Sequence, residues 1–179
     1  MAKQAKTALD SVLNHLLHNV LPAARDYEAA EDELSLAFNQ NPDPTSWEQQ
    51  GQHAKRRAAE VAIAIDGLVD RTAKALGLSK GKVRRQVASH CRIDGFPRPE
   101  CIERVRAVAN AYKHAVLDDE TLPITSESDV LATGPGYGVD GYGLGKISGV
   151  DVLVHQKNGK QRKFLADVSW STAGWSVSC

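Results

Sequence analysis

The sequence has few cysteines, three in 179 residues, and no two of them form a Cys-x-x-Cys pair. An odd number without that spacing argues against a disulfide framework and against a four-thiolate zinc site. Long apolar runs are also missing, so we expect no segment to span a bilayer. The first residues lack the apolar stretch and cleavage site of a secretory signal. These absences predict a cytoplasmic protein with no membrane association, no metal and no cofactor.

Acidic residues are absent from positions 71–93, which carry seven Lys and Arg. The overall net charge of zero hides this, because the charge is segregated along the chain. Residues 1–51 have a balance of −5, residues 52–117 of +8 and residues 118–179 of −3. A basic patch attracts phosphate backbones by counterion release, whatever the base sequence. The segregation therefore predicts a nucleic-acid partner, DNA or RNA.

Helical periodicity dominates the first two thirds of the sequence. Apolar residues recur at spacings of three and four from Leu9 to Leu21, and Pro22 is expected to kink or end this helix. The last helix of this part begins near Pro99 and is expected to run to about Leu117. We therefore predict an α+β protein that is mainly α, with a helical bundle over about residues 3–117.

Strand patterns follow later in the chain. Val150 to His155 and Gln161 to Val168 flank Lys157-Asn158-Gly159-Lys160. Asn-Gly favours the two-residue turn of an antiparallel hairpin, since both residues tolerate a positive φ. That turn would place Leu153 opposite Phe164. The hairpin needs a further strand or cover from the helices, and Trp170 and Trp175 are the expected cover.

Seven of the fourteen glycines lie in residues 134–149. Gly136-x-Gly138-x-x-Gly141 has the spacing of a dinucleotide fingerprint, but a strand is expected after it where that fingerprint needs a helix. We interpret the segment as a tightly turned loop. The predicted organisation is a helical domain, residues 1–120, with an appendage of glycine-rich loop and β-hairpin, residues 121–179, packed on it.

A different motif lies at residues 69–88, which read VDRTAKALGLSKGKVRRQVA. Gly77 is expected to end one helix with a positive φ, and Ser79 to cap the start of the next. The small or apolar positions expected between the two helices are Ala73, Leu76, Leu78, Val83 and Val87. With these residues at this spacing, the segment resembles the helix-turn-helix of phage Cro repressors and many bacterial regulators.

In that family the second helix enters the major groove of DNA, and dimers usually bind two half-sites. The resemblance therefore implies a nucleic-acid-binding protein, and it allows for a homodimer. Arg85 lies nearly opposite Val83 on the helical wheel, so it is predicted to be exposed. Gly81 departs from a good helix sequence and weakens the helix by about 1 kcal/mol relative to alanine. The residues expected to contact nucleic acid are Ser79, Lys80, Lys82, Arg84 and Arg85, with Arg71 and Lys74 anchoring the backbone.

A second polar edge lies on the helix after Pro99. Arg106, Asn110 and His114 are each four residues apart, and Lys113 lies beside them. As a catalytic group, His114 would act as general acid or base, with Arg106 or Lys113 stabilising developing phosphate charge. The alternative is structural: these residues pair with acids and fix the end of the helix.

A helical bundle with an Arg and a His on a late helix resembles the HEPN superfamily, which includes metal-independent ribonucleases of toxin and defence systems. Its signature is an Arg, four to six residues and a His. Arg84 or Arg85 with His90 fits that spacing, whereas Arg106 and His114 leave seven residues between them. Nucleic-acid binding is the leading hypothesis. A HEPN-like ribonuclease and a non-catalytic protein-interaction module stay open as alternatives.

Overall fold

A computed structural model describes residues 2–93, 96–114, 117, 119–133 and 150–178. It is an α+β protein that is mainly α, as predicted, with a small antiparallel sheet. The glycine-rich segment 134–149 lies outside the described residues. Among those that are described, no helix has both the length and the apolar character needed to cross a membrane.

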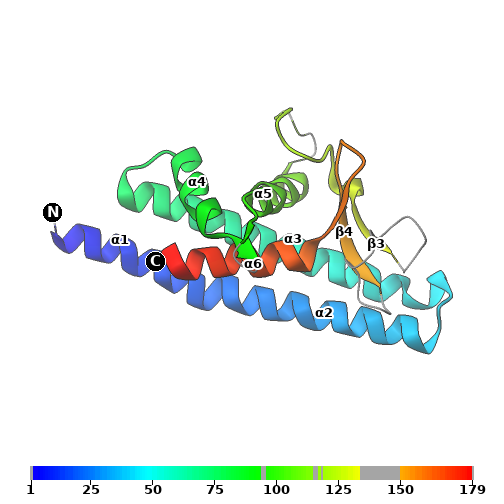
Figure 1. Ribbon diagram of the computed structural model, residues 1–179. Coiled ribbons are helices and arrows are strands. Elements are labelled where there is room, and N and C mark those ends of the chain that lie inside the picture. The colour runs from blue at the N-terminus through cyan, green and yellow to red at the C-terminus, as the bar shows by residue number, and fades with distance from the viewer. Residues whose placement is uncertain (1, 94–95, 115–116, 118, 134–149, 179) are drawn as a thin grey trace.

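The N-terminal helices form one long rod, in which α1 (Ala2–His15), the π-helix η1 (Leu16–Val20) and α2 (Leu21–Gln40) follow without interruption (Figure 1). The prediction that the helix could end at Pro22 is wrong. The amide of Leu21 donates to the carbonyl of Leu16, five residues back, in a π-turn. Pro22 therefore falls in the first turn of α2, where its missing N–H removes no bond of a regular helix.

Helix α3 (Pro44–Leu76) runs back along this rod and ends in a sharp corner. Gly77 has a φ of 64°. The amide of Leu78 donates to the carbonyl of Ala73 at 3.0 Å. Ser79 accepts a hydrogen bond from the amide of Lys82 and begins α4 (Lys80–His90). The two predicted caps are confirmed.

The hairpin of β1 (Arg92–Ile93) and β2 (Phe96–Pro97) follows α4 and leads to α5 (Glu100–Lys113). Helix α5 is shorter than predicted. His114 already has an extended backbone, and its amide donates to the carbonyl of Asn110, so the helix does not reach Leu117.

The sheet has the order β3 (Val130–Thr133), β4 (Asp151–His155), β5 (Gln161–Lys163), and all pairs are antiparallel. The short 3-10 helix η2 (Glu127–Asp129) precedes β3. Helix α3 approaches β3 closely: a Cβ on Gly51 would lie 3.2 Å from that of Ala132. The sheet thus gains the third strand and the helical cover that a lone hairpin lacks.

The predicted register of the hairpin is wrong by one residue. Leu153 pairs with Lys163, whereas the two-residue turn predicted Phe164 as its partner. The observed loop has three residues, because the amide of Gln156 donates to the carbonyl of Lys160 and the amide of Gly159 donates back to Gln156, each at 2.8 Å. Gly159 has a φ of 77°, as such a turn requires at its last position.

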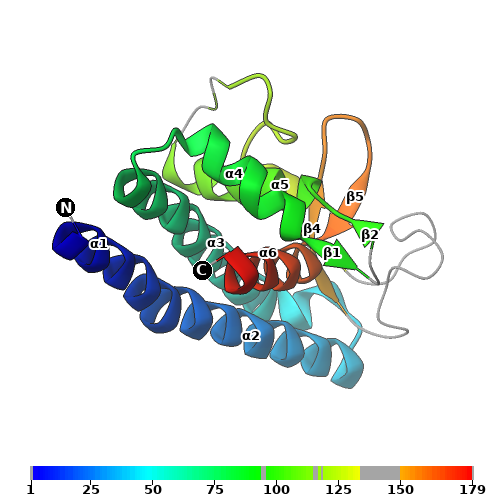
Figure 2. The ribbon, with the colours of Figure 1, turned by 60° about the vertical axis from the view of Figure 1, so that its left-hand side comes forward.

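The predicted strand over 161–168 is also wrong beyond its first three residues. Phe164 begins helix α6 (Phe164–Ser178), which lies between the N-terminal rod and α4 in Figure 2. Phe164 and Trp175 are buried in the same core as residues of α2, α3, α4 and α5. The expected cover by Trp175 is therefore real, but it is provided by a helix within the bundle, and Trp170 is only half-buried.

Candidate nucleic-acid interface

Helix α4 is held against the bundle by one apolar edge. Val83 and Val87 are each 2% exposed and belong to the main core. Leu78 is half-buried, as its predicted inward position requires. The same prediction is wrong for Leu76, which is 49% exposed, because it is the last residue of α3 and no described element covers it.

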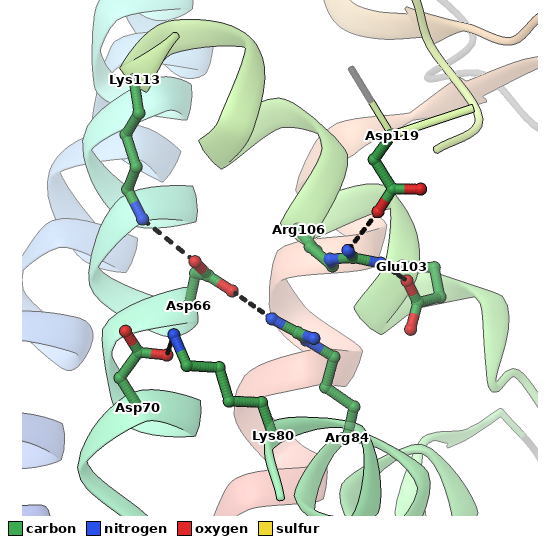
Figure 3. A network of polar contacts seen from close by, with 8 residues as sticks. All are labelled: Asp66, Asp70, Lys80, Arg84, Glu103, Arg106, Lys113 and Asp119. Carbon is green, nitrogen blue, oxygen red and sulfur yellow. Dashed lines mark hydrogen bonds and ion pairs between the residues drawn. The ribbon is translucent and has the colours of Figure 1, made fainter. Parts of the chain in front are cut away.

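One side of α4 is paired with carboxylates of α3. Asp66 and Asp70 lie one helical turn apart on α3, and Lys80 and Arg84 lie one turn apart on α4. Lys80 Nζ is 2.7 Å from Asp70 Oδ1, and Arg84 Nη2 is 3.4 Å from Asp66 Oδ1 (Figure 3). Two of the residues predicted to contact nucleic acid therefore already have carboxylate partners within the protein.

Asp66 also binds the end of α5. Its second oxygen accepts a hydrogen bond from Lys113 Nζ at 3.0 Å, so one carboxylate joins α3, α4 and α5. The Asp66 side chain is only 11% exposed. A largely buried carboxylate with two cationic partners fixes the positions of the helices that carry them. Asp66 therefore sets how α4 lies on the bundle.

The polar edge of α5 is divided between different carboxylates. Arg106 binds Glu103 at 3.1 Å and also binds Asp119. Hydrogen bonds from the hydroxyl and amide of Thr121, and then the Arg106 guanidinium, lower the pKa of Asp119. Arg106 and Lys113, the two groups proposed to stabilise phosphate charge, are thus both neutralised by acids of the chain.

The other catalytic candidates are not joined to this network by any described contact. His114 is exposed at the end of α5, Asn110 is half-buried, and His90 is exposed in the last turn of α4. Within the described residues, none of these three side chains makes a hydrogen bond or an ion pair. The structure supports the structural alternative for Arg106 and Lys113, and the residues that it describes form no acid–base pair around either histidine.

The outer face of α4, formed by Gly81, Lys82, Arg85, Gln86 and Ser89, is exposed throughout. Lys82 and Arg85 make no ion pair with any residue that the structure describes, and Arg85 is exposed as the helical wheel predicted. Lys74, on the last turn of α3, is also exposed. Arg71 donates a hydrogen bond to the hydroxyl of Ser11, at 3.5 Å, and contacts no carboxylate in the part of the chain that the structure describes. The hydroxyl of Ser79 serves as the cap of α4.

The chain matches no protein-family model, and neither the curated proteins nor the solved structures contain a match for it. No group of three or more His, Cys, Asp and Glu side chains capable of holding a metal occurs among the described residues.

The two cysteines that the structure describes are poor candidates for nucleophilic chemistry. Cys91 and Cys101 are free and buried. Burial raises the pKa of the Cys91 thiol to about 11 and raises that of Cys101 further. Since the thiolate is the reactive form, both thiols are expected to be inert near neutral pH.

Gly81 offers a direct test of the outer face as a free surface. Its φ is not positive, and an added Cβ would meet only Arg85 Nη1, at 3.8 Å, an ordinary contact. Gly81→Ala is therefore expected to raise the free energy of unfolding by about 0.5–1 kcal/mol through helix propensity alone. Urea unfolding followed by circular dichroism measures the change.

The matched control is Gly77→Ala at the α3–α4 corner. A Cβ added to Gly77 would meet nothing within 4 Å, but the φ of 64° at this position strains any L side chain, so the substitution is expected to destabilise the protein. If Gly81→Ala lowered stability as well, the first turn of α4 would not be free of contacts.

Proposed function

We propose that this protein binds nucleic acid through the outer face of α4, in the manner of a helix-turn-helix. The observation that carries the proposal is the division of basic residues on this helix. Lys80 and Arg84 are paired with Asp70 and Asp66 of α3, while Lys82 and Arg85 are exposed without ion pairs in the described residues. An exposed Arg on a positioned helix can bind a guanine edge or a phosphate.

The contacts proposed here are fewer than those expected from the sequence. Lys82 and Arg85 would bind directly, with Lys74 and Arg71 as phosphate contacts near the corner. Lys80 and Arg84 become positioning residues. We place this activity in the cytoplasm, and a homodimer would present two such helices to two half-sites. No observation favours catalysis, because Arg106 and Lys113 are already paired with carboxylates.

The double variant Lys82→Ala with Arg85→Ala tests the proposal. For a phosphate contact, the logarithm of the affinity falls against the logarithm of salt concentration with a slope of about −0.9 per neutralised phosphate. Loss of two contacts is therefore expected to make the slope shallower by about 2, with weaker binding at every salt concentration. Fluorescence anisotropy of a labelled DNA duplex, and of RNA of the same sequence, measures both quantities in a KCl series.

The matched control is Arg56→Ala with Lys160→Ala, which removes the same charge from exposed positions outside α4. It is expected to leave the slope close to that of the wild type. Two results would contradict the proposal: no salt-dependent binding by the wild type, or equal losses in the two double variants. Equal losses of affinity would show that the nucleic acid is attracted by the overall charge of the protein and does not bind α4 specifically.

A further inference from the structure

The β1–β2 hairpin directly after α4 carries an exposed aromatic ring. Phe96 is 69% exposed, the highest value among the exposed large apolar side chains of the described residues. In Figure 2 the β1–β2 hairpin follows the C-terminal end of α4, the helix of the proposed nucleic-acid interface. Single exposed apolar side chains are common on protein surfaces, so the neighbours of this ring decide whether it marks a binding site.

The base of the hairpin is packed against the core. Cys91, which ends α4, is fully buried, and its Sγ would lie 2.9 Å from a Cβ added to Gly174 of α6. The amide of Arg98 donates to the carbonyl of Cys91 at 2.7 Å and closes the hairpin. Phe96 lies within this hairpin, where it pairs with Ile93 of β1.

The surroundings of Phe96 are basic. Arg92 and Arg98, on either side of it in the hairpin, are exposed and make no ion pair in the described part of the chain. Residues 79–98 contain six Lys and Arg against one acid, Asp94. An exposed aromatic ring among cations is the combination that binds nucleic acid through unpaired bases, with the ring stacking on a base and the cations contacting phosphates.

We propose that Phe96 stacks on an unpaired base, and that the nucleic acid bound by α4 therefore has a single-stranded segment next to its duplex. This rests on the proposed function of α4. In an intact duplex the faces of the bases are covered by their neighbours, and insertion of a side chain costs a few kcal/mol of unstacking per step. A duplex with a single-stranded tail presents a base face without that cost.

The test compares a blunt duplex with the same duplex carrying a short single-stranded tail, both with wild-type protein and with Phe96→Ala. The wild type is expected to bind the tailed duplex roughly tenfold more tightly than the blunt one. This difference is the size of the affinity typically lost when one aromatic side chain that stacks on a base is removed. Phe96→Ala is expected to lose this preference while binding the blunt duplex as the wild type does. Phe96→Trp retains a stacking surface and is expected to keep the preference.

Leu76→Ala is the matched control, because it removes another exposed apolar side chain, at the end of α3 before the corner that leads into α4. It is expected to keep the tenfold preference. An unchanged preference in Phe96→Ala, or equal losses on the two duplexes, would overturn the stacking role and leave the function of α4 standing. Failure of the wild type to bind either duplex would instead overturn the proposed function itself.

Discussion

Asp167→Ala is expected to lower the free energy of unfolding by about 3–5 kcal/mol, because it leaves a buried guanidinium without its partner. Arg104 of α5 donates from Nε and Nη2 to the two carboxylate oxygens of Asp167 of α6, each at 2.6 Å. Their side chains are 5% and 1% exposed. Urea unfolding followed by far-UV circular dichroism measures the loss.

The control replaces both charged groups with apolar ones, Arg104→Met with Asp167→Leu. A buried ion pair pays a large desolvation cost, so an apolar pair of similar volume is expected to be close to wild type in stability, or more stable. If this double variant lost as much stability as Asp167→Ala, the loss would come from the changed packing of the side chains and not from an unpaired buried charge. A loss below about 1 kcal/mol in Asp167→Ala would contradict the buried pair itself.

Local features of the sequence predicted local structure well. Gly77 and Ser79 end and begin helices as their conformational preferences require. Arg85 is exposed because its angle from Val83 on the wheel depends only on helix geometry. These predictions succeed because each property is decided within about two turns of one helix.

Ion pairs between side chains on different helices of the bundle could not be predicted in this way. The sequence predicts that Lys80, Lys82, Arg84 and Arg85 all contact nucleic acid, yet Asp66 and Asp70 neutralise one side of this basic stretch. A signal was present, because both acids and both of their partners, Lys80 and Arg84, are spaced four residues apart. Recognising it requires knowing that α3 and α4 cross at the Gly77 corner with these sides facing one another.

Periodicity also leaves open which face of a helix is covered. Leu9, Leu13 and Leu17 extend the apolar stripe of the first helix and are exposed. The row of Val12, Leu16 and Val20 enters the core, and the half-buried Leu21 packs against it. The pattern predicted a helix correctly and overestimated its buried side. A similar limit explains why the C-terminal helix was not predicted. The alternation over 161–168 fits a strand, but Phe164 is buried in a core that is formed by helices distant in the sequence.

The second large effect is expected at Glu31, an acid of α2 that connects the bundle with the sheet. Its Oε1 accepts hydrogen bonds from the hydroxyl of Tyr27 at 2.5 Å and from the amide of Val152 of β4 at 3.1 Å. Glu31 is 1% exposed and Tyr27 is fully buried. Burial, followed by the charge of Glu31, raises the pKa of Tyr27, so its hydroxyl stays protonated as a donor.

Glu31→Ala would leave both donors buried without this acceptor. Each such group costs about 1–3 kcal/mol, so the free energy of unfolding is expected to fall by about 2–6 kcal/mol. Glu31→Gln keeps a carbonyl oxygen for the same donors and is expected to lose less than half as much. Because the contact joins α2 to β4, hydrogen exchange at the β4 amides should accelerate more than exchange in α4. Uniform acceleration would show global destabilisation without a specific loss of the sheet's attachment.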